Sequence, residues 1–390
     1  MDFSSNVRIL TWQGFLVGFN LWSPLAAIYF SKVSGSYALG MSVFATEMIS
    51  AAIFEIPTGI FSDKIGRKYS TMLGGFFYTL SFVFYAIGIS YWFLFVGAML
   101  EGLARSFYSG NNDALLYDSL NKSKKKEELE KWMGYIGSAE QWSIGIASLI
   151  GGFLYVVSSA LVMWLSVIPH FISFLMSFWL IDTKIHGEGS GNIYLHLKDS
   201  LKNFLQNKKI RYLSLSEIIG NGIGESSFYF RPVFIAMLWP AWAIGVASAM
   251  ANMAAAIGFG FSGRLMKKFK AENVLLFEQI YSVVASMTAF LFPTMLSPTL
   301  LSSTSLLYGP STVAQNSLMQ KEFNDEQRAT MGSLNSLAKN IFYGFCLVMV
   351  GWVADKTNPQ AALVGGQILA LVAVYMTWKL VKLIRAEKRV

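Results

Sequence analysis

Twelve long apolar segments follow one another along the 390-residue chain, and this pattern constrains the fold more than any other feature. A helix needs about 20 mostly apolar residues to cross the hydrocarbon core of a bilayer. We therefore expect an all-α membrane protein with twelve transmembrane helices. The expected spans lie at roughly 8–31, 37–61, 69–90, 91–118, 132–157, 160–181, 211–236, 240–264, 273–294, 297–320, 328–354 and 360–382.

The composition agrees with a membrane protein and argues against a soluble one. Hydrophobic residues make up 54% of the chain and charged residues only 14%, whereas soluble domains carry about 25% charged residues. The net charge of +8 would indicate nucleic-acid binding only on a soluble basic face. We therefore expect no nucleic-acid partner.

The single cysteine, Cys346, excludes an internal disulfide and a cysteine-based metal site. We expect no metal and no cofactor. The first apolar segment lacks the short apolar core and the small-residue cleavage site of a signal peptide, so we interpret it as a retained span.

The basic residues are distributed unevenly between the predicted loops. With a cytoplasmic N-terminus, 26 of the 31 Lys and Arg residues fall in cytoplasmic segments, and the outer loops hold only Lys32 and Lys356. Cytoplasmic loops of membrane proteins carry such an excess of Lys and Arg. We therefore predict cytoplasmic termini in a multi-pass protein of the cell (inner) membrane.

One gap between spans is longer and more polar than the others and leaves six spans on each side. Within it, Leu195, Leu197, Leu201 and Leu205 lie among basic residues. This pattern favours an amphipathic helix on the membrane surface, with a solvated tether as the alternative. We expect an N-terminal six-helix bundle over 1–182, a cytoplasmic linker over 183–210 and a C-terminal six-helix bundle over 211–390.

The loop "GIFSDKIGRK" (59–68) places four charged residues behind the second apolar segment. It resembles the signature loop of the major facilitator superfamily, G-x-x-x-D-R/K-x-G-R-R/K. The resemblance covers essentially the whole chain, implies the superfamily's fold of two six-helix bundles, and is to bacterial drug/proton antiporter-type members. The matching residues are Gly59, Asp63, Lys64, Gly66, Arg67 and Lys68.

Three further stretches bear on this resemblance. "RSFYSGNNDA" (105–114) loosely resembles the superfamily's motif in the fourth span, and "GFSGRLMKK" (260–268) faintly repeats the signature loop in the second half. "SIGIASLIGG" (143–152) keeps two glycines of the antiporter signature of the fifth span, but has Ala147 and Ser148 where that signature has Gly-Pro.

The chemistry of the signature loop predicts specific contacts. Gly59 would let a neighbouring helix approach closely, and Gly66 would permit a turn with positive φ. Asp63 would accept hydrogen bonds from Arg67 or from N–H groups at a helix start. The resemblance implies that these contacts form a latch that breaks as the two halves rock. The alternative is that the basic residues only anchor the topology.

Ionisable residues inside the predicted spans are the candidates for proton coupling, because each costs at least about 2.5–3.5 kcal/mol near the bilayer centre. Glu101 lies one turn from Arg105, which would hold it ionised in one state; a silent ion pair is the alternative. His170, in a span that the resemblance places at the periphery, is expected to be a packed histidine. The proton-coupling candidates are Glu47, Glu101, Arg105, Asp113 and Glu225.

Polar side chains near mid-depth of several spans predict a substrate cavity. On the fourth span, positions 101, 105, 108 and 112 recur at helical spacing and would share one face. The candidates for lining the cavity are Asn20, Tyr108, Asn112, Glu217, Asn221, Tyr229, Tyr308, Gln315, Asn316, Asn335 and Lys339.

The chain shows no Walker loop, no metal-spaced His/Cys cluster and no G-x-S-x-G elbow, so we expect a carrier rather than an enzyme. The mixture of carboxylates, aromatic residues and Met favours proton-coupled export of a small amphipathic solute by alternating access. The alternatives are uptake or facilitated diffusion of a nutrient such as a sugar or an organic acid, or a non-transporting sensor. We expect a monomer that contacts membrane lipid, a small-molecule substrate and protons.

Overall fold

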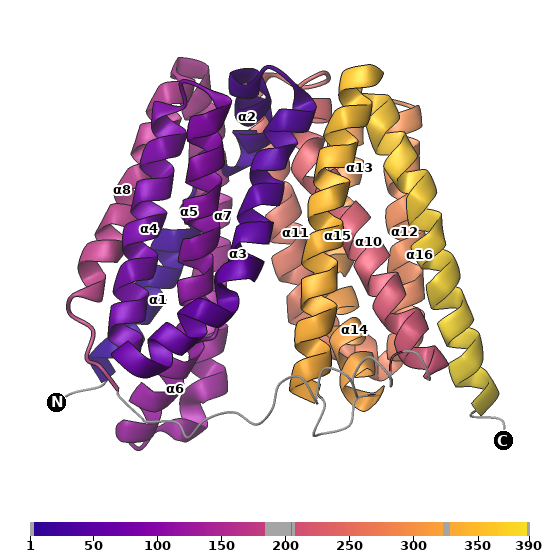
Figure 1. Ribbon diagram of the computed structural model, residues 1–390. Coiled ribbons are helices and arrows are strands. Elements are labelled where there is room, and N and C mark those ends of the chain that lie inside the picture. Colours follow the sequence, from indigo (N-terminus) through magenta and orange to yellow (C-terminus); the bar gives the residue numbers. More distant parts are fainter. Residues whose placement is uncertain (1–3, 184–203, 205–206, 323–327, 388–390) are drawn as a thin grey trace. The chain divides into compact units, whose positions relative to one another are not determined.

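Figure 1 shows the computed structural model of the protein, which describes residues 4–183, 204, 207–322 and 328–387. All regular structure within these residues is helical. The described helices fall into two compact units. The amphipathic helix expected around Leu195 to Leu205 lies outside the described residues, apart from Phe204.

The first unit consists of the helices up to residue 177 together with Pro240–Ala249 at the start of α11. Its helices are α1 (Ser4–Gly18), η1 (Ser23–Leu25), α2 (Ala26–Ser34), α3 (Tyr37–Ile65), α4 (Arg67–Ile87), α5 (Tyr91–Tyr108), α6 (Asn111–Lys122), η2 (Lys126–Glu128), α7 (Leu129–Val157) and α8 (Ser159–Ser177).

The second unit contains α10, the remainder of α11 and all later helices. Its helices are α10 (Lys208–Ile235), α11 (Ala241–Lys268), α12 (Ala271–Leu291), α13 (Ser297–Thr304), η3 (Ser305–Leu307), α14 (Tyr308–Glu322), α15 (Arg328–Lys356) and α16 (Pro359–Glu387).

Nine helical segments of the described residues are long and apolar enough to cross a membrane. All twelve expected ranges are largely helical, but the fourth, seventh and tenth, which correspond to α5–α6, α10 and α13–α14, are not among the nine. Charged and polar side chains interrupt the apolar sequence in these three. That they also span the membrane, and hence the number twelve, stays a prediction.

Three expected spans are interrupted rather than continuous. The first is broken between Gly18 and Ser23, where η1 begins and carries Pro24 in its first turn, and the tenth is interrupted by η3. The fourth is broken between α5 and α6, where Gly110 adopts φ +66°; a residue without Cβ adopts this conformation at little cost. The prediction that positions 101 to 112 share one face is therefore wrong beyond the break.

Polar residues start several of the helices. The Ser36 hydroxyl accepts a hydrogen bond from the Leu39 N–H at the start of α3, and Ser158 does the same for Leu161 at the start of α8. Each cap satisfies one of the N–H groups that a helix leaves without an intrahelical partner. Both helices thus begin close to where the change from polar to apolar sequence places them.

An aromatic cluster forms the core of the first unit. Trp22, Phe30, Phe82 and Tyr85 are all buried, and the ring centroids of Phe30 and Tyr85 lie 5.1 Å apart in a tilted arrangement. Such pairs contribute about 0.5–1.5 kcal/mol each beyond their area burial. The cluster holds α4 against α2, and it places the Tyr85 hydroxyl inside the unit.

The two glycines that remain of the antiporter signature permit close backbone contacts of α7. A Cβ at Gly151 would overlap the Leu21 carbonyl, and one at Gly152 would overlap the Trp242 carbonyl at the start of α11. Small residues allow helices in membranes to approach in this way. The motif therefore has a packing role in this chain despite its missing Gly-Pro.

Candidate functional site

Close packing of α3 against α5 creates a polar site within the first unit. A Cβ at Gly102 would overlap the Glu47 carbonyl oxygen, so only glycine allows the two backbones to approach this closely. One turn further along α3, the Ser50 hydroxyl donates to the Met99 carbonyl at 2.8 Å. The contact places the side chains of α3 beside those of α5 at mid-helix.

Four side chains meet there, which we call the Glu47–Glu101 cluster: Glu47, Tyr85, Glu101 and Arg105. Arg105 Nη1 lies 2.6 Å from Glu47 Oε1 in an ion pair. The Tyr85 hydroxyl donates to Glu101 Oε2 at 2.8 Å. Sequence spacing predicted that Arg105 pairs with Glu101 on its own helix. Its ion pair is instead with Glu47, because the close packing at Gly102 brings that carboxylate within reach.

The charges in this cluster are unbalanced. Two carboxylates, both less than a tenth exposed, share one guanidinium. Burial of an ion away from water is costly unless a partner compensates it. Arg105 forms its ion pair with Glu47, whereas the hydrogen-bond donor to Glu101 is a neutral phenol. The arrangement is suited to holding one proton on its carboxylates.

A second polar contact of the first unit joins α8 to the break that follows α1. His170 Nε2 lies 2.7 Å from Asn20 Oδ1, and the imidazole packs on the Phe82 ring with centroids 3.9 Å apart. His170 is fully buried, so the expectation of a packed histidine is confirmed. Asn20, which is expected to line the cavity, uses its side-chain oxygen for this contact with His170.

In the second unit, a carboxylate on α10 gathers donors from two other helices. Glu217 accepts hydrogen bonds from Asn335 and, at 3.3 Å, from Gln315. The Lys339 ammonium lies 3.6 Å from its other oxygen. The structure thereby brings together four residues that were predicted to line a cavity, but their side chains contact one another. Through these contacts Glu217 connects α10 with α14 and α15.

Two further ionisable groups lie along α10. The Glu225 carboxylate lies beside the Tyr308 hydroxyl and interacts with it electrostatically. Arg231 is buried and donates to the Leu301 carbonyl at 3.2 Å and to the Thr304 hydroxyl at 3.3 Å. The structure thus places Glu225, predicted as a proton-coupling residue, beside Tyr308, predicted as a cavity residue.

The signature loop forms an ion pair that its sequence does not reveal. Gly66 adopts φ +123° between α3 and α4, as predicted, and a Cβ there would also overlap the Asp182 carboxylate. The turn directs Arg67 toward α6, where its Nε lies 3.1 Å from Asp118 Oδ2. The predicted contact between Asp63 and Arg67 is therefore wrong, because Arg67 binds Asp118 instead. Asp63 is exposed on the last turn of α3.

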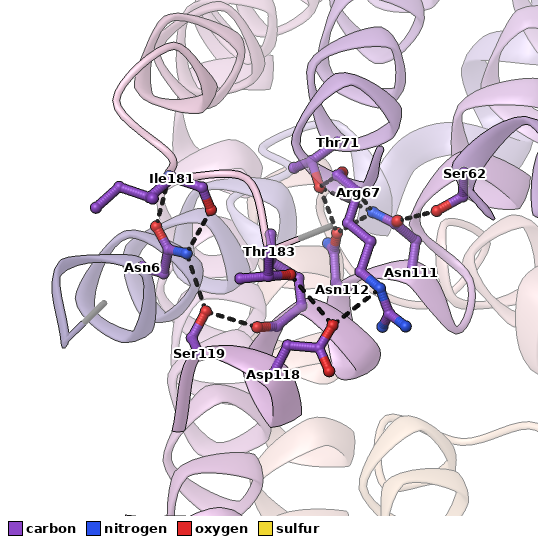
Figure 2. A network of polar contacts seen from close by, with 11 residues as sticks. Asn6, Ser62, Arg67, Thr71, Asn111, Asn112, Asp118, Ser119, Ile181 and Thr183 are labelled. Carbon is purple, nitrogen blue, oxygen red and sulfur yellow. Dashed lines mark hydrogen bonds and ion pairs between the residues drawn. The ribbon is translucent and has the colours of Figure 1, made fainter. Parts of the chain in front are cut away.

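Figure 2 shows the network around this ion pair. Thr183 donates to the same Asp118 oxygen at 3.1 Å, and Asn111 donates to the Thr71 hydroxyl at 2.9 Å and accepts from Ser62. Beside it, Asn6 donates to Ser119 at 2.9 Å and to the Ile181 carbonyl at 2.8 Å. We call this set the α6 network. It ties one end of α1, α3, α4 and α6 to the segment after α8.

The other residues of the signature loop behave differently from one another. The Lys68 ammonium donates to the Phe178 carbonyl at 2.8 Å, and Lys64 is exposed. A Cβ at Gly59 would meet no atom within 4 Å, so the close helix approach predicted for Gly59 is not found. Thr58 makes the helix contact instead, donating to the Ser106 carbonyl at 3.0 Å.

Of the remaining candidates, one joins the α6 network and the others make separate contacts or are exposed. Tyr108 packs on α4, where a Cβ at Gly74 would overlap its ring, and Asn112 accepts from Thr71 at 3.0 Å. Tyr229 contacts the Tyr343 ring. Asp113 and Asn316 are exposed, while Asn221 is half-buried on α10.

A family model described as Major Facilitator Superfamily matches residues 10–345. The chain belongs to this superfamily. It is therefore a multi-pass membrane transporter, and the family implies a small-molecule substrate.

Relatives within the superfamily are distant. The chain is 22% identical over 327 residues to an uncharacterized MFS-type transporter, YxaM, of Bacillus subtilis (strain 168), covering 81% of this chain and 80% of YxaM. It is 23% identical over 159 residues to the class B tetracycline resistance protein of Escherichia coli, covering 40% of this chain and 36% of that protein.

Two solved structures share the fold at 14% identity. The nucleoside transporter NupG superposes with a TM-score of 0.78, covering 98% of this chain and 100% of NupG. A bacterial homolog of the human lysosomal transporter Spinster superposes with a TM-score of 0.75, covering 97% of this chain and 96% of the homolog. At this identity the likeness shows the superfamily fold and not the substrate.

Two residues central to this superfamily member were missed by sequence reasoning. Asp118 lies five residues beyond Asp113, and only the turn after Gly110 decides which of the two is buried. Tyr85 lies on the third predicted span, in which sequence reasoning named no functional residue. From the sequence alone, a tyrosine that hydrogen-bonds a buried carboxylate cannot be distinguished from a tyrosine whose ring faces lipid, because both lie in an apolar segment.

Proposed function

We propose that this transporter is a proton-coupled exporter of a small amphipathic solute. The observation that supports the coupling is the Glu47–Glu101 cluster, in which two buried carboxylates share one guanidinium. The relative named for tetracycline resistance favours export of a drug-like compound over uptake of a nutrient.

In the proposed mechanism, Glu101 carries the exchanged proton. While the cluster is shielded from water, the proton neutralises Glu101, the carboxylate that is not in the ion pair with Arg105, and Tyr85 fixes the orientation of Glu101. When water or a cationic substrate reaches the cluster, the ionised form of Glu101 becomes favourable and the proton leaves. Rocking of the two halves would expose the cluster alternately to the two sides.

The second unit supplies further candidates for this cycle. Glu225 with Tyr308 is a second carboxylate–phenol pair and is proposed as an alternative proton carrier. We also retain the signature loop as a proposed latch, with Asp63 as the residue left to bind a partner when the two halves close.

The test is transport by purified protein in liposomes under an imposed pH gradient, with compounds first selected by thermal shift. Glu101→Gln should abolish pH-driven flux while substrate binding and exchange persist. The matched control is Glu278→Gln, because Glu278 is a carboxylate of the second unit that accepts a hydrogen bond from Ser311 at 3.0 Å and is not a member of the cluster. Unchanged pH-driven flux in Glu101→Gln would remove Glu101 from the mechanism.

The direction of flux separates export from the alternatives. Substrate that moves in the direction opposite to the proton flow supports a proton-coupled exporter. Substrate that moves in the same direction as the protons supports nutrient symport. Binding without any flux in the parent protein would support a sensor.

A further inference from the structure

A basic groove lies between α10 and α16, at the end of the second unit that the charge pattern predicts to be cytoplasmic. It encloses about 560 Å³, within the range of roughly 300–1,000 Å³ typical of small-molecule sites. On both helices the lining residues follow one another at spacings of three, one and three, so the first and last lie within two turns of each other and each helix presents one face to the groove. The lining residues are Lys208, Arg211, Tyr212 and Leu215 from α10, and Lys379, Lys382, Leu383 and Ala386 from α16.

The groove concentrates positive charge without compensation. None of its four cations, Lys208, Arg211, Lys379 and Lys382, forms an ion pair with a carboxylate of the described residues. The neighbouring Lys209 points elsewhere and pairs with Glu322 and Glu387. The hydrogen bond to Glu387 raises the pKa of Lys209. The carboxylates of Glu322 and Glu387 are therefore used outside the groove, and no carboxylate of the described residues neutralises its four cations.

An exposed apolar stripe on α16 leads to this groove. Ile368, Leu371, Tyr375 and Trp378 are each between 39% and 53% exposed and recur at spacings of three, four and three. The next position in the same series is Lys382, whose ammonium lies 3.6 Å from the Trp378 ring centroid. Aromatic residues are enriched at the level of lipid headgroups. The stripe therefore passes from apolar side chains, through interfacial aromatics, to the cations.

The depth of the groove matches the boundary of a bilayer. From Lys208 to Leu215, α10 rises about 10 Å, which is comparable to the headgroup layer of about 5–8 Å together with the start of the hydrocarbon core. Lys and Arg at helix ends commonly only extend toward water. Here they line a concave site together with the apolar side chains of Leu215 and Leu383, which suits a ligand that is anionic at one end and apolar at the other.

We propose that the groove between α10 and α16 binds an anionic phospholipid of the cytoplasmic leaflet. The phosphate contacts Arg211 and Lys382, and the acyl chains follow the stripe from Trp378 to Ile368. Basic pockets between helices on the cytoplasmic side bind anionic headgroups in this way. The site is distinct from the Glu47–Glu101 cluster and does not depend on the direction or coupling of transport.

The test uses the purified full-length protein, stripped of lipid in a neutral detergent. Thermal shift and native mass spectrometry are measured with phosphatidylglycerol, with phosphatidylcholine of the same acyl chains, and with inorganic phosphate. Phosphatidylglycerol should raise the melting temperature more than phosphatidylcholine, and phosphate alone should give no shift. Equal shifts from the two lipids, or a full shift from phosphate, would refute an anionic-lipid site.

Two double variants locate the site. Arg211→Gln combined with Lys382→Gln should weaken phosphatidylglycerol binding by about 10- to 30-fold. This estimate follows because each cation near an anionic membrane surface contributes about 1 kcal/mol to binding. The matched control, Lys267→Gln with Lys268→Gln, removes the same charge from the exposed end of α11 and should bind as the parent does. Equal weakening in both variants would mean general attraction and no specific groove.

A third measurement does not depend on the variants folding. A photoactivatable phosphatidylglycerol with its reactive group near the headgroup is cross-linked to the parent protein and mapped by peptide mass spectrometry. Labelling should concentrate in peptides containing 208–215 or 379–386. Labelling confined to other cytoplasmic segments would overturn the proposal.

Discussion

At the residue scale, burial decides which of several similar side chains has a structural role. Asp113 and Asp118 lie on the same helix, yet Asp113 is exposed in its first turn whereas Asp118 is buried and contacts Arg67 and Thr183. The side chain of Asp118 is 3% exposed and that of Arg67 is 22% exposed. A largely buried pair of this kind is costly to break, because the remaining charge is left uncompensated.

We therefore expect Asp118→Asn to lower the apparent melting temperature of the purified protein by about 5–10 °C, corresponding to about 2–3 kcal/mol. Asp113→Asn, the matched control on the same helix, should change it by less than about 2 °C. Equal effects of the two substitutions would show that the α6 network does not stabilise the first unit.

The ion pair of the Glu47–Glu101 cluster gives a second prediction at this scale. Arg105→Ala leaves the buried Glu47 carboxylate without its partner, so both transport and thermal stability should fall. Glu47→Gln combined with Arg105→Ala removes both charges and should recover at least half of the lost stability. A double variant less stable than Arg105→Ala alone would contradict the pairing. Melting curves of the parent, both single variants and the double variant supply the complete cycle.

At the element scale, glycines determine which helices approach closely enough to bring polar groups together. The backbone of α3 occupies the space beside Gly102, and this contact brings Glu47 to Arg105. Other glycines, including Gly145 on α7, have no atom within 4 Å of an added Cβ. A helical glycine with open space is replaced by alanine at little cost or with a small gain in stability.

Gly102→Ala should accordingly lower the melting temperature by about 3–8 °C, because the added methyl group forces α3 and α5 apart at a cost of about 1–3 kcal/mol. It should also reduce pH-driven flux, since the Glu47–Arg105 contact lengthens. Gly145→Ala is the control and should leave both measurements unchanged. Wild-type flux and stability in Gly102→Ala would mean that the helices tolerate a wider spacing.

At the scale of the whole molecule, the distribution of basic residues predicts the orientation in the membrane. In a Cys346→Ser background, single cysteines replace Lys32 and Lys124. An impermeant thiol reagent added to intact cells should label position 32 and leave position 124 unlabelled, because positive residues are retained on the cytoplasmic side. Labelling after lysis controls for accessibility. Labelling of position 124 alone in intact cells would reverse the predicted topology.

Local chemistry in the sequence determined the class of the protein and much of its element order. Long apolar segments require helices in a bilayer, because no water is present there to satisfy backbone groups. The positive φ at Gly66 also followed from local sequence, since a turn at that point requires a residue without Cβ. The signature loop likewise indicated the superfamily, which the match over residues 10–345 then showed.

The tertiary structure alone decided the partners of the charged groups. Spacing along one helix paired Arg105 with Glu101, but the ion pair joins α5 to α3. The break at Gly110 moved Asn112 away from the face of α5 and buried Asp118. Helical periodicity reports only neighbours on the same helix, whereas these contacts depend on how closely two helices approach and how they are rotated. That information lies in packing, which no single segment of sequence contains.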